Sequence, residues 1–446
     1  MKCIKGLSFS TGNEMAFDPA IKNLPIPGRA VLPLTSFFGK MTPLVAAGDS
    51  VQAGQIVAKG PDKLCPPLLA SVTGQISAIQ PWPTPDGDES LSLVIDSIEE
   101  DGVGAEDAAL VSDGDLKDMI RRIRGSGIRE VEPSPWPIAA RLAQPGSFPA
   151  GLIPPESDLG QPIDCLIING MDTQPGLWMR KAAIRTRGEE ILESIPLLTR
   201  LCGASRIVFA VPKGHVLSDG FVQGLRSHSV ELVYCPTMYP LALAPVLVPF
   251  LTGKELPRAT MDTRSVGTVV IDVITALKVL EAIRYSKPAL DVLVQITAPA
   301  SGLDTLVSVK EGTLLEDILK ELPPLSHKTA KVICGGPFLG ETLYQLNVPV
   351  TQETASIILQ SEHEVTRYSS LACVSCGYCV RHCPMKLLPN ELSKLCEYGK
   401  FDVAERMDLY SCIECGICAY VCPVKRPMVQ FMRFGKRELE LERKQL

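Results

Sequence analysis

Two short cysteine runs constrain the last part of the chain more than any other feature of its sequence. CVSCGYCVRHCP fills residues 373–384 and CIECGICAYVCP fills residues 412–423, and in both runs two, two and three residues separate the cysteines and a proline follows the last. Thiolates are soft ligands that suit iron–sulfur clusters and zinc. This spacing is typical of two-cluster ferredoxins, in which the fourth cysteine of each run binds the other cluster.

The rule predicts a small C-terminal domain with two 4Fe-4S clusters and crossed ligand sets. The first set is Cys373, Cys376, Cys379 and Cys422, and the second is Cys412, Cys415, Cys418 and Cys383. Zinc is the main alternative, because paired CxxC motifs also form zinc ribbons. Eight cysteines in two ferredoxin-type runs favour iron–sulfur clusters that lie close enough to exchange electrons.

The composition indicates an ordinary soluble globular protein of about three domains. Of its 446 residues 46% are hydrophobic and 21% charged, while the net charge of −6 and the 5% of aromatic residues give no reason to expect nucleic-acid binding. We expect the other cysteines to be small buried residues in a reducing compartment. They are Cys3, Cys65, Cys165, Cys202, Cys235, Cys334 and Cys396.

No apolar run of the chain is long enough to predict a membrane span. The N-terminus lacks the apolar core of a signal peptide, and MYPLALAPVLVPFLTG at residues 238–253 is short and contains three prolines. We expect this segment to be buried and broken by its prolines. Membrane association would then depend on a partner.

Residues 28–97 predict an all-β domain, because short β-branched runs alternate with glycine turns. The pattern GDxVxxGQ followed by ASVxGxI resembles the barrel-sandwich fold of biotinyl and lipoyl domains. Those domains carry a modified lysine between two methionines. That motif is missing here, so we expect Lys59 and Lys63 to be ordinary surface lysines.

The centre of the chain alternates between expected helices and strands. DGDLKDMIRRIRGSG at 113–127 predicts an amphipathic helix with an acidic start and a basic end. Strands are expected at 164–170, 206–212 and 230–236, and a helix with a glycine stop at 188–205. This order favours a largely parallel sheet. Residues 288–342 predict strand, strand–helix and strand.

In this order of segments, the chain resembles RnfC, the peripheral iron–sulfur subunit of Rnf ion-pumping electron-transport complexes. The resemblance rests on the β stretch, LIING at 166–170, GTVVIDVITALKVLEAI at 267–283, GGPFLG at 335–340 and the cysteine runs. It implies a multidomain α+β fold. The expected parts are a barrel-sandwich β domain (1–112), a Rossmann-like α/β domain (113–287), an SLBB β-grasp domain (288–366) and a helical dicluster ferredoxin domain (367–446).

Typical members of this family pass hydride from NADH to FMN on a glycine-rich loop, roughly GGAGFPT, after the first central helix. Residues 127–142 of this chain read GIREVEPSPWPIAARL instead. The residues in place of the glycines are Glu130, Glu132, Pro133, Pro135 and Trp136. Glycines let the backbone approach a phosphate, whereas glutamates repel it and prolines lack the backbone donor.

The acidic turn of the family's flavin site reads NGMDTQP here, so Asn169 and Asp172 are the remaining candidates for cofactor binding. Gln174 replaces the second acidic residue. This form resembles NqrA, a related subunit of the sodium-pumping quinone reductase, which lacks that flavin site and also lacks the clusters. We therefore do not expect FMN, although a flavin held by other residues stays open.

The resemblance implies a subunit at the cytoplasmic face of the inner or cell membrane, bound to integral-membrane and other subunits of an Rnf-type complex. It would exchange electrons with a protein partner, a cytochrome or a ferredoxin, rather than with NADH. One alternative is an NADH:acceptor oxidoreductase subunit in which FMN feeds the two clusters. A weaker one is that the clusters only stabilise the fold. Residues 424–446 could dock on a membrane partner or cover the second cluster.

Overall fold

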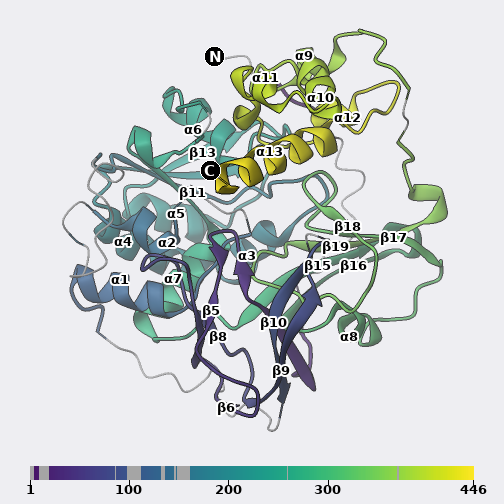
Figure 1. The fold of residues 1–446 in the computed structure, drawn as a ribbon. Helices are drawn as coiled ribbons and strands as arrows, with labels where there is room; N and C mark the ends of the chain where they lie inside the picture. The colour runs from purple at the N-terminus through teal and green to yellow at the C-terminus, as the bar shows by residue number, and fades with distance from the viewer. Residues whose placement is uncertain are drawn as a thin grey trace.

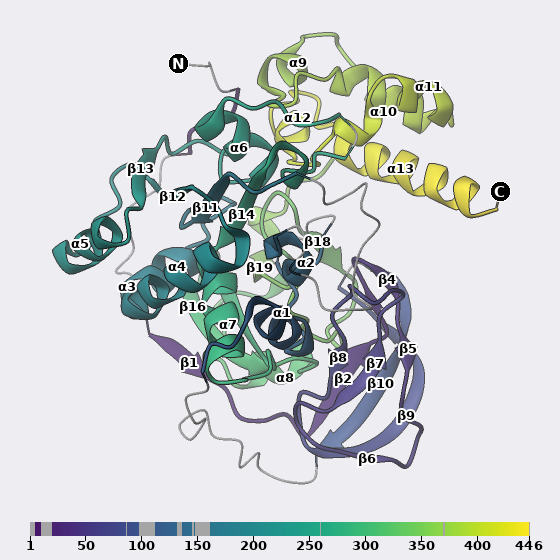
Figure 2. The same ribbon diagram turned by 90° about the vertical axis from the view of Figure 1, so that its left-hand side faces the viewer.

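Four parts of the chain are visible in the computed structural model: an N-terminal β domain, a central α/β part, a mixed sheet and a C-terminal helical part (Figure 1). The structure describes residues 5–9, 20–85, 87–97, 112–131, 136–144, 147, 161–258, 260–368 and 371–445. After a rotation by 90° the helical part still lies at one end and the N-terminal β domain at the other (Figure 2).

The N-terminal domain consists of short antiparallel strands, as its alternating sequence predicts. The strands are β2 (Arg29–Pro33), β3 (Thr35–Ser36), β4 (Gly39–Lys40), β5 (Thr42–Pro43), β6 (Ser50–Val51), β7 (Ile56–Lys59), β8 (Leu68–Leu69), β9 (Gly74–Pro83) and β10 (Glu89–Ser97). They form the sheets β2-β10-β9-β6 and β5-β7-β8 and the hairpin β3-β4. Leu32, Val57 and Leu93 are fully buried between them. Lys59 and Lys63 are exposed.

The central part is built on the parallel sheet β13-β12-β11-β14, which confirms the predicted strand direction. Its strands are β11 (Cys165–Asn169), β12 (Arg206–Pro212), β13 (Glu231–Cys235) and β14 (Thr268–Asp272). Its helices are α1 (Leu116–Gly125), α2 (Ile138–Leu142), α3 (Met179–Thr186), α4 (Gly188–Cys202), α5 (Asp219–Ser227), α6 (Ala244–Thr252) and α7 (Val273–Arg284), with a 3-10 turn at Arg264–Val266. Alternate residues of β11 face opposite sides: Leu166 packs with α1, α4 and α7, and Ile167 packs with α6.

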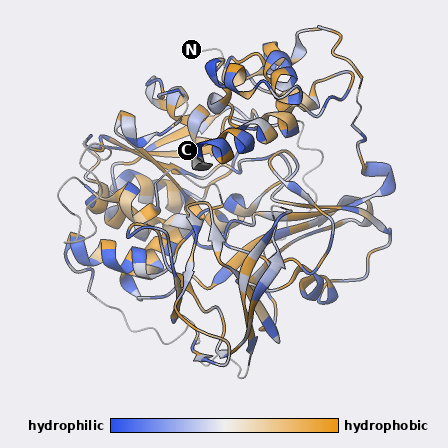
Figure 3. Cartoon of the chain, viewed as in Figure 1, coloured by the Kyte–Doolittle hydropathy of each residue, from blue (hydrophilic) through white to orange (hydrophobic). Residues whose placement is uncertain are grey.

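Local signals fix the ends of the two helices that the sequence predicts most clearly. Asp115 caps α1 by accepting a hydrogen bond from the Asp118 amide at 2.8 Å. Gly203 ends α4 in the left-handed region at φ 66°, where glycine is favoured. The strands of the two large sheets are mostly hydrophobic, and polar residues gather on α1 (Figure 3).

Residues 238–253 are largely buried, as expected. A cis peptide joins Tyr239 to Pro240, and α6 begins four residues later. Leu241 and Leu247 are in the core behind the sheet. In the described part of the chain, no helix combines the length and the apolar character needed to cross a membrane.

The mixed sheet has the strand order β1-β16-β15-β19-β17-β18. Its elements are β1 (Ile21–Asn23), β15 (Asp291–Ala298), β16 (Leu303–Lys310), α8 (Leu315–Lys320), β17 (Thr329–Cys334), β18 (Glu341–Leu343) and β19 (Ser356–Ser361), with 3-10 turns at Pro299–Ser301 and Glu362–Glu364. The predicted strand, strand–helix, strand order is confirmed. The sequence analysis did not anticipate that β1, which precedes the N-terminal β sheets, pairs in parallel with β16.

The C-terminal part is helical, as predicted. Its helices are α9 (Tyr378–His382), α10 (Pro389–Glu397), α11 (Phe401–Arg406), α12 (Ile417–Tyr420) and α13 (Met428–Gln445), with a 3-10 turn at Leu409–Ser411. Pro389 opens α10, and Gly399 follows its end at φ 68°. Cys396 is fully buried against Gly435, which confirms that it is a core residue.

The scattered cysteines that the structure describes are all buried, as expected. They are Cys65, Cys165, Cys202, Cys235, Cys334 and Cys396, and Cys3 lies outside the described residues. Burial raises the pKa of Cys65 and of Cys202 to about 11, chiefly because the thiolate would lose its hydration. These thiols are therefore unreactive packing groups.

Candidate iron–sulfur centres and the cavity of the central sheet

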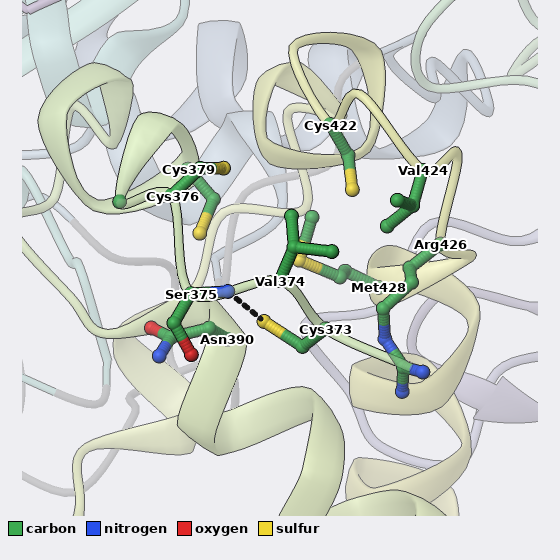
Figure 4. Close-up of a pocket in the computed structure, with 11 residues that line it drawn as sticks. Cys373, Val374, Ser375, Cys376, Cys379, Asn390, Cys422, Val424, Arg426 and Met428 are labelled. Carbon is green, nitrogen blue, oxygen red and sulfur yellow. Dashed lines mark hydrogen bonds between the residues drawn. The ribbon is translucent and has the colours of Figure 1, made fainter. Parts of the chain in front are cut away.

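The first cavity of the helical part is lined by the four cysteines predicted for the first cluster: Cys373, Cys376, Cys379 and Cys422. Cys422 comes from the second run and faces the other three across the cavity, with the sulfur atoms directed towards a shared space (Figure 4). Val374, Val424 and Met428 complete an apolar wall. The structure thus brings together residues that are far apart in the sequence.

Each run turns around its own cysteine in the same way. Ser375 and Gly377 lie in the left-handed region at φ 54° and 74°, and Glu414 and Gly416 repeat this at 56° and 76°. As a result, the Ser375 amide donates to Cys373 Sγ and the Glu414 amide to the corresponding sulfur of its own run, both at 3.4 Å. Backbone donors to thiolates are among the features that set cluster potentials.

The second cavity is lined by the other predicted set, Cys383, Cys412, Cys415 and Cys418, together with Leu387, Ile417, Val429 and Met432. Burial raises the pKa of Cys412 to about 11 and that of Cys415 to about 12. At neutral pH such free thiols hold their protons, so binding of a metal must displace them. Soft thiolates in sets of four suit iron–sulfur clusters.

A zinc site needs four ligands about 2.0–2.3 Å from a single ion. Among the residues that the structure describes, no group of three or more His, Cys, Asp or Glu side chains could hold one metal ion. The cysteines instead surround cavities, which fits ligands that bind different irons of one cluster. The donor sets therefore favour the iron–sulfur interpretation over zinc.

The two cavities differ in their surroundings. Cys376 is exposed beside the first cavity, whereas Cys383, Cys415 and Cys418 of the second are buried. The second cavity is also bound to the central part: Tyr239 Oη donates to the Cys415 carbonyl oxygen at 2.6 Å. The first cavity consequently lies at the surface and the second towards the interior.

Helix α13 covers both cavities. Met428 lines the first, and Val429 and Met432 line the second. Lys436 Nζ donates to the Cys412 carbonyl oxygen at 2.7 Å and contacts Glu414 at 2.6 Å. Of the two roles considered for residues 424–446, the structure favours covering, because these side chains face the cysteines.

The flavin-site candidates Asn169 and Asp172 both bind the protein's own backbone. Asn169 Nδ2 donates to the Ala242 carbonyl oxygen at 2.9 Å, and its Oδ1 accepts from the Met171 amide at 3.0 Å. Asp172 accepts from the Arg180 amide at 2.8 Å, just inside the start of α3. Asp172 lines a third cavity, whose described lining does not include Asn169.

This third cavity lies where β11 and β14 end, the usual place for a ligand in a parallel sheet. It is lined by Arg129, Val131, Asp172, Thr173, Leu177, Met179, Arg180, Asp272, Ile274, Thr275, Lys278 and Ala355. Arg129 forms a buried ion pair with Glu311. Gln352 accepts from Lys278 Nζ at 3.1 Å and donates to Glu311 at 3.2 Å. The chain's own charges thus occupy one wall.

The ionisable groups of this wall are shifted by burial and by each other. Burial lowers the pKa of Lys278, because the ammonium loses hydration. Burial alone would raise the pKa of Asp272, but the nearby Arg180 charge and hydrogen bonds from Thr275 and Ile274 lower it. Asp272 is therefore held as a carboxylate at the start of α7.

The described part of the altered loop does not fit a flavin or phosphate in the way a glycine cluster would. Arg129 and Val131 place side chains in the cavity wall. Gly127 is required elsewhere: at φ 70° its Cβ would lie 3.0 Å from Leu69, so it serves the contact with the N-terminal domain. Glu132, Pro133 and Pro135 lie outside the described residues.

One physical reason in the sequence analysis was wrong. Glu130 was expected to repel a phosphate, but it forms a buried ion pair with Arg141 that compensates its charge. Trp136 Nε1 donates to Asp262 at 3.2 Å. The obstacle in the described loop is thus Arg129 with its partner rather than Glu130.

Gln174 has a role that the sequence analysis missed. Its Nε2 donates to the Gly335 carbonyl oxygen at 2.7 Å, and its Oε1 accepts from the Phe338 and Leu339 amides, each at 2.9 Å. Gly336 must be glycine there, because at φ 108° its Cβ would lie 2.4 Å from Gln174 Nε2. A carboxylate could not donate, so an amide suits this position.

Comparison with known families gives matches in three parts of the chain. The RnfC barrel sandwich hybrid domain matches residues 1–102, the Nuo51 FMN-binding domain residues 146–281 and the 4Fe-4S dicluster domain residues 372–426. An RnfC protein of the Na(+)-translocating ferredoxin:NAD(+) oxidoreductase complex of Acetobacterium woodii is 27% identical over 94% of this chain and 92% of its own. The chain belongs to the RnfC family.

Two further RnfC relatives are of similar extent. That of the proton-translocating ferredoxin:NAD(+) oxidoreductase complex of Clostridium ljungdahlii is 27% identical over 94% of this chain and 90% of its own. That of the ion-translocating oxidoreductase complex of Rhodobacter capsulatus is 26% identical over 97% of this chain and 82% of its own. The family assignment thus extends over nearly the whole chain.

The match to an FMN-binding domain does not support the expectation that this RnfC chain lacks FMN. The matched region, residues 146–281, includes the turn with Asn169 and Asp172 but begins after the altered loop at 127–142. A 4Fe-4S dicluster domain is present at the expected place.

Proposed function

We propose that this chain is the electron-transfer subunit of a membrane-bound Rnf-type ion-translocating complex. It passes single electrons through two 4Fe-4S clusters to or from a protein redox partner, a cytochrome or a ferredoxin, rather than NADH. The three relatives support the complex, since each is part of a translocating oxidoreductase. The chain would lie peripherally, at the cytoplasmic face, against integral-membrane and other subunits.

The observation that carries the proposal is the pair of four-cysteine cavities under one helix. Each cavity draws three cysteines from one run and the fourth from the other. When bound, 4Fe-4S clusters supply reversible one-electron transfer. The protein needs no acid or base for this step. Its residues hold the thiolates, exclude water with Met428 and Met432, and orient backbone donors towards the sulfurs.

The proposed independence from NADH rests on the third cavity. Arg129 enters its wall where typical members have glycines, and Glu311 and Gln352 bind that guanidinium and its backbone amide. Removing Arg129 alone would leave Glu311 buried without its ion-pair partner, which is costly. The central part then serves as a scaffold that positions the second cavity through Tyr239 and Gln174.

We also propose the finer fold assignments that the resemblance implies. The parallel sheet with helices on both faces supports a Rossmann-like domain at 113–287, and the mixed sheet with α8 supports an SLBB β-grasp domain at 288–366. The helical domain would comprise 367–446. Since β1 joins the mixed sheet, the proposed N-terminal domain of residues 1–112 contributes one strand to its neighbour.

The second candidate function is an NADH:acceptor oxidoreductase subunit in which FMN feeds the clusters. The match of residues 146–281 to an FMN-binding domain favours it. In that case residues outside the usual glycine loop would hold the flavin. The two functions differ in whether NADH reduces the clusters.

Anaerobically purified protein with reconstituted clusters distinguishes the two. Bound flavin is assayed first, and then NADH is added with FMN supplied while the cluster absorbance is followed. We expect no stoichiometric flavin and no bleaching with NADH, while dithionite still bleaches the clusters. Stoichiometric flavin with fast bleaching by NADH would overturn the proposed NADH independence. Failure of dithionite to bleach would overturn the electron-transfer role itself.

A further inference from the structure

The face around the first cavity is apolar and open to solvent. Leu371 is 63% exposed, Val374 59% and Tyr378 44%, and Cys376 itself is exposed between them. Val374 also lines the cavity, so the exposed surface and the cysteine site are continuous. The second cavity has no comparable setting, because three of its four cysteines are buried. The first cavity is therefore the end of the site that another protein can reach.

The charge around this face has one sign. The segments that surround the first cavity, residues 371–390 and 415–430, contain Arg381, Lys386, Lys425 and Arg426 but no Asp or Glu. Yet the whole chain has a net charge of −6. The local excess of positive charge is thus not a general property of the protein.

Two of these cations are held over tyrosine rings. The Arg381 guanidinium lies 4.6 Å from the centre of the Tyr378 ring, and Lys425 Nζ lies 5.9 Å from that of Tyr420. Lys5 adds a third cation, since its Nζ donates to the Val380 carbonyl oxygen at 3.5 Å. Cation–π contacts fix where these charges lie.

The nearest acidic groups along the chain do not cancel this charge. Glu397 is paired with the buried Arg426. Glu414 is bound by Arg433 and Lys436 on the far side of the second run. Arg381 and Lys425 consequently present their charges to solvent beside exposed tyrosines.

We propose that the surface formed by Leu371, Val374, Tyr378, Tyr420, Arg381 and Lys425, here termed the docking face, binds a small acidic one-electron carrier protein. The inference rests on the proposed function and assigns its partner by charge and place. One electron passes between carrier and chain, so one is oxidised as the other is reduced, and no bond or proton is exchanged. Complementary charge accelerates encounter, while the apolar centre excludes water.

The test measures electron transfer between the reconstituted holoprotein and a pre-reduced small acidic ferredoxin by stopped flow. For the wild type we expect the second-order rate constant to fall about fivefold or more from low to physiological salt. At low salt, Arg381→Glu and Lys425→Glu should each lower it by roughly three- to tenfold. Lys63→Glu, an equal charge change on the exposed surface of the N-terminal domain, should leave it within about twofold.

Iron content and dithionite bleaching of each variant must match the wild type, which shows that the sites are intact. A rate that ignores salt, or that falls equally in Lys63→Glu, would overturn the docking face. So would faster exchange at low salt with a basic cytochrome c than with the acidic ferredoxin. If the wild type exchanges electrons with neither carrier although dithionite reduces it, the proposed function fails, not just its docking face.

Discussion

Tyr239 donates its phenolic hydrogen to the Cys415 carbonyl oxygen at 2.6 Å, which connects the central part directly to a cysteine of the second cavity. The Tyr239 ring also lies against Phe338, with ring centres 4.5 Å apart. Phe338 in turn contacts Gly416, where an added Cβ would lie 3.1 Å from the Phe338 ring. The second cavity is thus fixed against the rest of the protein from two sides.

Tyr239→Phe keeps the ring and removes only this buried hydrogen bond. We expect a loss of stability of about 1 kcal/mol, the usual value for one such bond. Urea titration that follows the cluster absorbance measures it. Tyr398→Phe, at a residue that is 74% exposed, is the control and should show no measurable change. Equal effects of the two changes would argue against a role for the Cys415 contact.

Crossed ligation makes a prediction about which cysteines act together. Cys422→Ser should alter the same cluster as Cys373→Ser, and Cys383→Ser the same cluster as Cys412→Ser, because each pair lines one cavity. Each change should lower the iron content from roughly eight to roughly four per chain. Iron analysis with electron paramagnetic resonance separates the two signals.

The control for iron content is Cys396→Ala, since Cys396 is buried in the core away from both linings. It should keep the full iron content. If Cys422→Ser instead altered the same signal as Cys412→Ser, ligation would follow each run separately, and the crossed assignment would be wrong.

Gln174→Glu tests the amide between the central part and the GGPFLG turn. The carboxylate cannot donate to the Gly335 carbonyl oxygen, so we expect a loss of roughly 1–3 kcal/mol at neutral pH. The loss should shrink at lower pH, because a protonated carboxyl can donate again. Gln223→Glu, on the exposed side of α5, should have little effect at any pH. A loss that does not depend on pH would point to steric causes.

A double-mutant cycle on Arg129 and Glu311 tests the charge pair in the third cavity. Arg129→Met and Glu311→Gln should each cost about 3–5 kcal/mol, and the double variant clearly less than their sum. The exposed pair Arg29 and Asp96 is the comparison and should couple by less than about 1 kcal/mol. Additive losses at Arg129 and Glu311 would show that the pair is not coupled.

Asp272 predicts a dependence on pH. Its pKa is lowered in the folded protein, so its stabilising effect is present above its ordinary pKa and is lost as pH falls through the folded value. Asp272→Asn keeps a capping oxygen but removes the charge near Arg180, and should cost about 3 kcal/mol at pH 7. The difference from the wild type should shrink below about pH 4.

Tryptophan fluorescence during urea unfolding reports this change, since Trp136 and Trp178 lie beside the central sheet. Asp219→Asn on the exposed start of α5 should change stability by less than about 0.5 kcal/mol. A constant difference between Asp272→Asn and the wild type from pH 7 to pH 3.5 would rule out the charge as its cause.

The sequence predicted those features whose signals are local. The Asp115 cap, the glycine after α4 and the alternation of β9 and β10 are written in neighbouring residues, and the structure has them. The cysteine spacing also predicted which four residues meet in each cavity, because the rule of crossed ligation already includes the long-range pairing.

The features that the sequence did not reveal depend on partners far along the chain. Arg129 meets Glu311 across 182 positions, and Gln174 meets Phe338 across 164. No periodicity or motif marks such pairs. Glu130 shows the risk of reading a charge without its partner, because Arg141, eleven residues away, already compensates it.

Helix α13 has a consequence for damage as well as for shielding. Met428 closes the first cavity and Met432 the second, so one helix protects both sites from the solvent. Oxidation of either thioether would convert an apolar wall into a polar one. Any event that loosens the helix would then admit oxygen to both sites at once, and their lifetimes in air should be a single property of the protein rather than two.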